Sequence, residues 1–275
     1  MTSDVPAGPS PDPSSAELPA WPRERGFLIT GGAGDIGRAT ASLLLEAGAQ
    51  VVLADQDRAT LDHAVEGLAA AGSPGRLGAV ACDVTRADDL ARAVEVAAAM
   101  TGRLDGAFNA AGIIGPPFQG VAIAEPDWER VIAVNLTGAF LSVQAEMAAM
   151  RRAGNGGSIV NAASVAGLVG ARLSVAYGAA KHGVVGLTRC AALDGAPDGI
   201  RVNAVCPNWT EGTMTEALRP AAPGRDLDGR MAGKTPLGRI GRPGDTAATV
   251  VWLLSPQSGY ITGAAIPVDG GFTAA

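Results

Sequence analysis

Tyr177 and Lys181 stand four positions apart in the stretch Tyr-Gly-Ala-Ala-Lys, and together they could transfer a proton. On a helix this spacing places the phenol and the ammonium group on one face, within reach of a common ligand. A phenol has a pKa of about 10 and is a poor base at neutral pH. Lowering that pKa by about three units requires roughly 4 kcal/mol of preferential stabilisation of the phenolate. A neighbouring ammonium group and a second positive charge could supply it, although the pair alone would be interpreted as a solvated helix face.

A glycine-rich turn at positions 30–37 could bind phosphate groups. It reads Thr-Gly-Gly-Ala-Gly-Asp-Ile-Gly and joins an apolar run at 27–30 to a helical pattern at 36–47. Glycines allow a sharp turn and a close approach of the backbone to a pyrophosphate, which then lies on the helix N-terminus. The position between a first strand and a first helix makes the turn indicative. The candidate cofactor contacts are Gly31, Gly34, Asp35, Ile36 and Gly37.

Asp55 follows the second apolar run, 24 residues after Gly31. A carboxylate at this place can accept hydrogen bonds from the hydroxyls of the adenosine ribose and would repel a 2′-phosphate. Neither Gln56 nor any residue of the glycine turn is basic. The sequence therefore predicts NAD, and not NADP, as the cofactor.

The elements that must position these residues alternate between short apolar runs and longer amphipathic stretches. Alternation of this kind predicts βαβ units, a parallel sheet and helices on both of its faces. We expect a Rossmann-type, doubly wound α/β fold of about seven strands in a single domain. The expected strands are 27–30, 51–54, 78–82, 104–108, 158–161, 201–205 and 264–268, and the expected helices are 36–47, 58–71, 87–100, 127–152, 176–193 and 245–254.

Two segments depart from this alternation. Residues 1–22 are rich in Pro, Ser, Ala and Gly, and they lack the apolar periodicity that would offset their ordering entropy, so they are predicted to be a disordered tail before the domain at 23–275. Residues 208–242 show no such alternation and are rich in Pro, Gly and charged residues. A loop of this length inside a compact domain is usually functional, and we expect a lid over the substrate site.

The composition argues against several classes of protein. A formal net charge of −6 and a pI near 5.0 disfavour a basic surface for nucleic acid or anionic lipid. No stretch reads as long and apolar enough to span a bilayer, since the best one, 131–147, contains Asn135, Gln144 and Glu146. The N-terminus lacks the basic start and apolar run of a secretion signal. We expect a cytoplasmic protein without nucleic-acid or membrane partners.

The cysteines point to no metal. Cys82, Cys190 and Cys206 are an odd number at wide spacing, and none forms a metal-like cluster with the two histidines. Reduced thiols and no metal site are therefore expected.

Together with Ser164, which precedes Tyr177 by 13 residues, these features resemble the short-chain dehydrogenase/reductase family. The resemblance covers residues 26–275. It implies a catalytic tetrad in which Ser164 binds the substrate hydroxyl, Tyr177 transfers its proton, Lys181 binds the nicotinamide ribose and Asn135 holds a water relay by its main chain. It further implies cofactor contacts from Asp83, Val84, Asn109, Ala110, Gly112, Pro207 and Thr210, besides Tyr177 and Lys181.

The chain departs from the family pattern around the cofactor. Position 35, where the family has the second glycine of the turn, holds Asp35; Asp tolerates unusual backbone angles and is a good helix N-cap, so the turn can still form. Its carboxylate would weaken pyrophosphate binding unless it points away. The glycine that usually follows the proline is Asn208, which also accepts left-handed angles, and Thr213 stands one residue later than the family's common threonine.

The predicted function is NAD-dependent interconversion of a secondary alcohol and a ketone. The expected pocket, from 113–119, 165–174 and 208–239, is largely apolar, which favours a small uncharged alicyclic, terpenoid or steroid-like alcohol. An NADPH-dependent ketone reductase is one alternative, and Asp55 counts against it. A catalytically silent dinucleotide-binding sensor is a second, although it would be expected to lose Tyr177 or Lys181. An enoyl reductase is a third, although those relatives space Tyr and Lys further apart.

The resemblance also implies a homo-oligomer, a tetramer or a dimer, formed through the two long helices.

Overall fold

The computed structural model describes residues 23–72, 76–117, 119–172, 174–221 and 223–275, so the tail predicted at 1–22 lies outside the described residues. Within the described part, seven parallel strands form one sheet in the order β3-β2-β1-β4-β5-β6-β7. The predicted α/β fold is confirmed. The strands are β1 (Gly26–Thr30), β2 (Gln50–Asp55), β3 (Leu77–Ala81), β4 (Gly106–Asn109), β5 (Gly157–Ala162), β6 (Ile200–Pro207) and β7 (Ala265–Val268).

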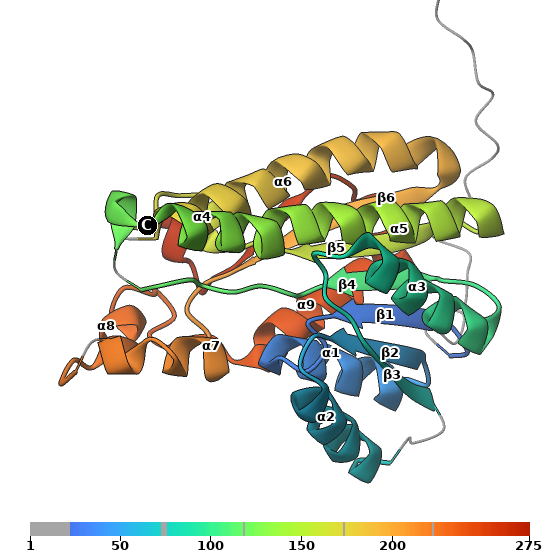
Figure 1. Ribbon diagram of the computed structural model, residues 1–275, viewed down its shortest axis with the longest axis horizontal. Helices are drawn as coiled ribbons and strands as arrows, with labels where there is room; N and C mark the ends of the chain where they lie inside the picture. Colours follow the sequence, from blue (N-terminus) through green and yellow to red (C-terminus); the bar gives the residue numbers. More distant parts are fainter. Residues whose placement is uncertain (1–22, 73–75, 118, 173, 222) are drawn as a thin grey trace, which may run out of the picture.

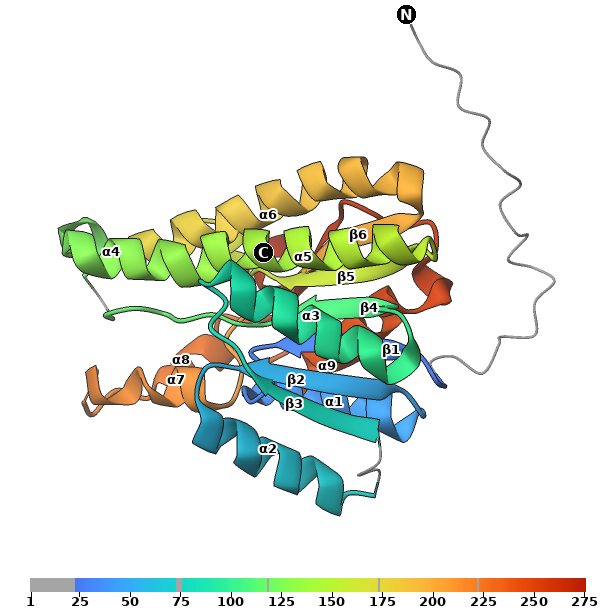
Figure 2. The same ribbon diagram turned by 45° about the vertical axis from the view of Figure 1, so that its right-hand side comes forward.

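Helices cover both faces of this sheet (Figure 1, Figure 2). One face carries α1 (Asp35–Glu46), α2 (Arg58–Ala70) and α9 (Pro243–Leu254), and the other carries α3 (Ala87–Thr101), α5 (Gly138–Ala153) and α6 (Val175–Gly195). Because both faces are covered, central strands such as β1 are buried along their whole length, which is why they read as continuous apolar runs. Short 3₁₀ turns complete the fold at Gly120–Ala122, Val165–Gly167, Ala196–Asp198, Arg219–Ala221, Pro256–Ser258 and Phe272–Ala274.

The strand order reverses between β1 and β4, since β2 and β3 lie on one side of β1 and all later strands lie on the other. In an open parallel sheet such a reversal leaves a crevice beyond the carboxyl ends of the strands, where ligands bind. The glycine turn follows β1 directly and Ser164 follows β5. The topology therefore brings the two halves of the predicted site to one edge of the sheet.

The helix predicted at 127–152 consists of α4 (Glu125–Ile132), a π-helical turn η3 (Ala133–Thr137) and α5. The joined helix at 125–153 corrects one expectation, because by length and composition it is apolar enough to cross a membrane. Core helices of soluble proteins meet the same criterion. Its inner residues Val143, Met147 and Met150 are buried against the sheet, as in a core helix.

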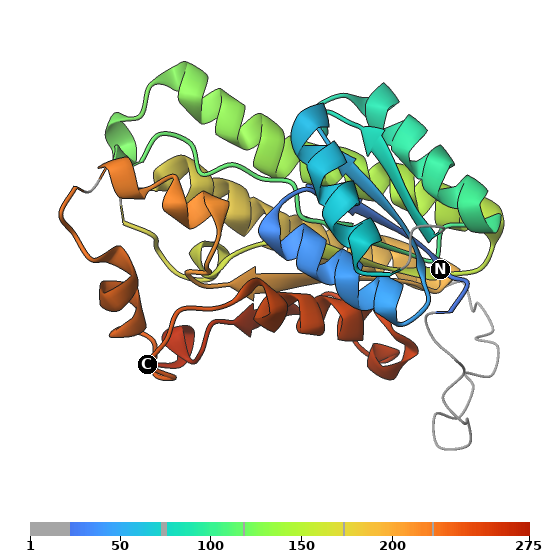
Figure 3. The ribbon, with the colours of Figure 1, turned by 90° about the horizontal axis from the view of Figure 1, so that it is seen from below.

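The segment predicted as a lid contains two short helices, α7 (Thr213–Glu216) and α8 (Leu227–Ala232). Its two stems meet in a bridge between Thr210 and Gly241. The end of the lid also touches the carboxyl-terminal segment, where the amide of Leu237 donates to the Gly270 carbonyl. Figure 3 shows these orange helices at the end of the molecule where the C-terminus lies.

Candidate active site

A cavity of about 400 Å³ opens over the carboxyl ends of the strands at the strand-order reversal. It extends from Asp55 at the end of β2 to Lys181 on α6, and the start of the lid closes over it. Of the predicted cofactor and catalytic residues, it is lined by Gly31, Gly34, Asp35, Ile36, Gly37, Asp55, Asp83, Val84, Ala110, Gly112, Ser164, Tyr177, Lys181, Pro207 and Thr210.

The glycine turn has the backbone that the sequence predicts. Gly31 has a φ of +65°, and a Cβ there would collide with the backbone of Ala111, so only glycine fits. Gly34 precedes the first residue of α1 with an extended backbone and lines the cavity. The first N–H groups of an α-helix lack partners within the helix. The amino end of α1 therefore offers donors and a positive partial charge to an anion in the cavity.

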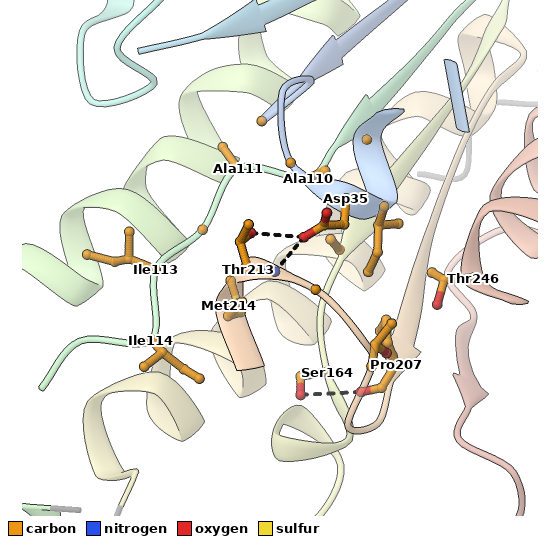
Figure 4. Close-up of a pocket in the computed structure, with 18 of the residues that line it drawn as sticks. Asp35, Ala110, Ala111, Ile113, Ile114, Ser164, Pro207, Thr213, Met214 and Thr246 are labelled. Atoms are coloured by element: carbon orange, nitrogen blue, oxygen red, sulfur yellow. Dashed lines mark hydrogen bonds between the residues drawn. The ribbon is translucent and has the colours of Figure 1, made fainter. Parts of the chain in front are cut away.

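Asp35 is the first residue of α1 and not its N-cap, which is Gly34. The prediction of a capping role for Asp35 is therefore wrong, because Asp35 lies inside the first turn and its carboxylate is taken up by other donors. The Asp35 carboxylate accepts hydrogen bonds from Thr213 of the lid and from Arg38 (Figure 4). It is thus held by the lid.

Asp55 borders the other end of the cavity. One carboxylate oxygen accepts a hydrogen bond from the Ala33 amide at 3.1 Å and the other from the Gln56 amide at 2.8 Å. These bonds fix the carboxylate beside the glycine turn. Asp83 and Val84, which follow β3, line the same end.

Ser164, Tyr177 and Lys181 meet at the opposite end. Nζ of Lys181 lies 5.5 Å from the centre of the Tyr177 ring and donates to the Ala162 carbonyl at 2.7 Å. Only 4% of Lys181 is exposed. Oγ of Ser164 accepts from the Ala166 amide at 3.1 Å and lies 3.5 Å from the carbonyl oxygen of Pro207 (Figure 4). The spacing of the three residues in the sequence thus corresponds to one cluster in space.

The electrostatics of this cluster differ from the sequence prediction in one respect. Burial raises the pKa of Tyr177, a hydrogen bond with Ser164 opposes this rise, and Cys206 adds to it. Burial lowers the pKa of Lys181 to about 8. Lys181 keeps its charge at neutral pH but donates to a carbonyl, and burial still holds the pKa of Tyr177 above its usual value, so the protein alone leaves the phenol protonated. A lowered pKa at Tyr177 therefore requires a further positive group in the cavity.

Asn135 lies in the π-helical turn η3 and is buried. Its side chain accepts from the amide of Ile113 at 2.8 Å and donates to the carbonyl of Ile113 at 2.7 Å. A Cβ at Gly112 would come 2.8 Å from Oδ1 of Asn135 and 3.5 Å from Nζ of Lys181, so Gly112 is the spacer between them. The side chain of Asn135 is therefore held by the main chain of Ile113.

Asn109 does not line the cavity, unlike the other predicted cofactor contacts. Its side chain points into the core, where Nδ2 donates to Glu146 at 3.0 Å and to Asn161 at 3.0 Å, and Oδ1 accepts from Thr30 at 3.3 Å. Asn161 in turn donates to Thr188 of α6. This buried network ties β1, β4 and β5 to the helix that carries Tyr177 and Lys181.

Glu146 is the member of this network that sequence reasoning treated only as an interruption of an apolar stretch. It is 1% exposed, and its Oε1 has no hydrogen-bond partner. Burial raises the pKa of its carboxyl group to about 8, against the opposing effect of the Asn109 amide. The sequence signal that could have identified Glu146 was an acidic residue on the inner face of a long apolar helix.

At the start of the lid, Pro207 and Thr210 line the cavity as predicted. Glu24 is the sole non-glycine residue of the described chain with a positive φ, so Asn208 does not adopt the left-handed angles considered for it. Its Nδ2 instead donates to Thr235 at 3.4 Å. Trp209, Glu211 and Met214 also line the cavity, and all three lie in the segment 208–239 that was predicted to border the pocket.

The chain is similar to known dehydrogenases over nearly its whole length. A family model described as "Enoyl-(Acyl carrier protein) reductase" matches residues 31–273. The chain is 42% identical over 250 residues to a 2-(S)-hydroxypropyl-CoM dehydrogenase of Xanthobacter autotrophicus, covering 90% of this chain and 96% of that one. It is 39% identical over 246 residues to a cyclohexanol dehydrogenase of an Acinetobacter species, covering 90% and 94%.

A solved structure of NAD⁺-bound xylitol dehydrogenase has a TM-score of 0.83 and 32% identity, covering 90% of this chain and 99% of that one. Relatives that act on alcohols support oxidoreduction between a secondary alcohol and a ketone. The fold, the order of the motifs and these likenesses agree, and the chain belongs to the short-chain dehydrogenase/reductase family.

Proposed function

We propose that the protein is an NAD-dependent dehydrogenase of an uncharged alicyclic secondary alcohol. The observation that carries the proposal is the single cavity with Asp55 at one end and Ser164, Tyr177 and Lys181 at the other. The residues present fit a dinucleotide, because Gly31, Gly34 and Gly112 leave the cavity wall without side chains and α1 points its amino end into it. When bound, the nicotinamide ring supplies the hydride acceptor and a positive charge.

In this proposal the chain's own residues handle the alcohol and its proton. Ser164 hydrogen-bonds the substrate hydroxyl and Tyr177 takes the hydroxyl proton as general base. Lys181 binds the ribose hydroxyls near the ring and, with the positive charge of the bound cofactor, lowers the pKa of Tyr177 from its raised value. The main chain of Asn135, whose side chain is held by Ile113, connects Lys181 to solvent.

The cofactor preference rests on Asp55. Its carboxylate is fixed at the turn by the amides of Ala33 and Gln56, and a negative 2′-phosphate placed there would be repelled. No arginine or lysine other than Lys181, at the far end, lines the cavity formed by the described residues. NAD is therefore favoured over NADP.

The substrate class rests on the lining beside Ser164. The cavity lining includes the apolar side chains of Ile113, Ile114, Val165, Trp209 and Met214, and Figure 4 shows Ile113, Ile114 and Met214 to one side of Ser164. The charged lining residues of the whole cavity are four acids, Asp35, Asp55, Asp83 and Glu211, and one lysine, Lys181. A phosphorylated or carboxylated substrate would gain little here. The name of the cyclohexanol dehydrogenase relative also supports an alicyclic alcohol.

The test is oxidation of a panel of secondary alcohols with NAD⁺ or NADP⁺, followed by the absorbance of the reduced cofactor. We expect cyclic, uncharged alcohols and NAD⁺ to give the highest kcat/KM. Preference for NADPH and a ketone would favour the reductase alternative, and binding of NAD⁺ without turnover of any alcohol would favour the silent sensor. The cytoplasmic location and the homo-oligomer stay predictions from the sequence.

A further inference from the structure

The lid is bound to the cofactor turn by a contact that the sequence did not predict. One carboxylate oxygen of Asp35 accepts two hydrogen bonds from Thr213, from its amide at 2.8 Å and from its hydroxyl at 2.9 Å. The other oxygen accepts from Nη2 of Arg38 at 2.7 Å. Figure 4 shows Asp35 on α1 and Thr213 on the lid joined directly by these two hydrogen bonds. We call this pair the Asp35–Thr213 clasp.

The clasp supplies the hydrogen bonds between the tip of the lid and the preceding part of the described chain. In the described part of the chain, residues 212–234 make no other hydrogen bond to any residue before 208. The helix α8 is fixed inside the lid, because Asp228 accepts from Trp209 at 3.0 Å and from Arg219 at 2.6 Å. The hydrogen bonds that hold the tip of the lid to the glycine turn and α1 thus come from one residue pair.

Two departures from the family pattern meet in this pair. Gly212 has a φ of +132°, and a Cβ at this position would collide with the Asp35 carboxylate. A glycine at 212 therefore makes room for the acid at 35, and the threonine one place later supplies both donors. A glycine at position 35 would leave Thr213 without this acceptor.

The charge state of Asp35 agrees with this arrangement. Partial burial works to raise the pKa of its carboxyl group, but the hydrogen bonds from Thr213 and the Arg38 guanidinium outweigh burial and hold that pKa below its usual value. The acid is therefore ionised at neutral pH, which makes it a strong acceptor.

We propose that Asp35 is a positioning residue that holds the lid over the cavity before a cofactor binds. This inference depends on the proposed function in one respect: it takes the cavity to be the dinucleotide site. A lid held by the protein itself is ordered in advance, so cofactor binding loses less conformational freedom.

The test is hydrogen exchange of the free protein, measured by mass spectrometry on peptides that cover residues 212–218, without cofactor or substrate. Asp35→Ala should speed this exchange by about tenfold or more, since it removes hydrogen bonds to a charged group. Asp35→Asn keeps an acceptor oxygen and should restore part of the protection. Asp226→Asn is the matched control, because Asp226 accepts from the Gly229 amide at the start of α8 and has no hydrogen bond outside the lid among the described residues. It should leave residues 212–218 unchanged.

A double-mutant cycle makes the test specific to the pair. Thr213→Val removes the hydroxyl donor, and in the Asp35→Ala background it should add little further exchange. Unchanged exchange in Asp35→Ala, or fully additive effects of the two substitutions, would overturn the proposal. If Asp35→Ala fails to fold by circular dichroism, Asp35→Asn and Thr213→Val with their double variant give the same answer. No turnover is measured, so the clasp and the NAD-dependent activity can fail separately.

Discussion

Tyr177 is the side chain on which the proposed chemistry depends most directly. Tyr177→Phe removes the hydroxyl and keeps the ring that packs beside Lys181, so we expect kcat to fall at least ~100-fold, the low end for a general acid–base group. Tyr260→Phe is the matched control, because Tyr260 is the chain's other tyrosine and its side chain is fully exposed. Steady-state rates with the best alcohol of the panel check this. A Tyr177→Phe enzyme that keeps most of its activity would remove Tyr177 from the mechanism.

Asp55 sets the cofactor preference at the same scale. Asp55→Ala loses a charged acceptor for the ribose hydroxyls, so we expect KM for NAD to rise about tenfold and the gap in kcat/KM between NAD and NADP to narrow. Asp62→Ala serves as control, because Asp62 pairs only with Arg58 on the exposed side of α2. Kinetics with both cofactors measure the gap. Equal kcat/KM values for NAD and NADP in the unmutated enzyme would refute the assignment.

The sequence predicted the positions of single site residues well where several motifs agreed on them. It predicted poorly which way a side chain points. Ser164, Tyr177 and Lys181 were placed by spacing and by the strand edge they follow. Asn109 was expected at the cofactor, but successive side chains of a strand point to opposite faces. Since Phe108 and Ala110 line the cavity, Asn109 must point away from it, and this alternation could have been used beforehand. The direction of Asp35 depends on Thr213, 178 residues away, which no local pattern encodes.

At the scale of elements, Glu146 on α5 makes the stability of the helix–sheet layer depend on pH. Its folded-state pKa of about 8 lies above the unfolded value near 4.5. The folded protein therefore holds a proton that the unfolded chain releases between these values, and stability falls as pH rises from about 4.5 to about 8. Glu146→Gln stays neutral, so its Tm should be higher than the unmutated Tm at pH 8 and nearly flat across this range.

Thermal unfolding at a series of pH values, by circular dichroism, measures this dependence. Glu66→Gln is the control, since Glu66 is exposed on α2 and should not alter the slope. Parallel curves for Glu146→Gln and the unmutated protein would show that the buried carboxyl group does not titrate in this range. Glu146→Leu should be destabilising by about 1–3 kcal/mol instead, because the Asn109 amide then loses a buried partner.

The helices and strands were predictable where their buried residues recur in a regular pattern along the sequence. All seven strands and the long helices were expected within a few residues of their observed ends, because continuous apolar runs and amphipathic stretches are the direct trace of a covered parallel sheet. The lid helices α7 and α8 were missed. They have four and six residues, too few for a periodic pattern, and tertiary contacts such as Asp228 with Trp209 hold them. The π-helical turn at Ala133–Thr137 left no trace either, because its residues suit an α-helix equally well.

At the scale of the whole molecule, a cofactor that binds only the folded state must raise the unfolding temperature. NAD at about 100 times its Kd stabilises by roughly 2.7 kcal/mol, which in a chain of this size corresponds to a rise in Tm of roughly 5–10 °C. NADP at the same concentration should raise Tm less. Differential scanning fluorimetry measures both, with Asp55→Ala as the variant in which the two shifts should converge. Equal shifts in the unmutated protein would speak against the NAD preference.

The place of β1 in the middle of the sheet also has a consequence for how the chain reaches its native state. β1 hydrogen-bonds β2, its near neighbour in sequence, and β4, and the carboxylate of Asp105 accepts from the Gly26 amide, 79 positions away in the sequence. Pairing between strands so far apart in the sequence forms slowly, because the chain loses the entropy of closing a long loop before the stabilising contacts form. During synthesis β1 therefore leaves the ribosome well before β4 has been made. Until then the edge of β1 that pairs with β4 has no strand to hydrogen-bond.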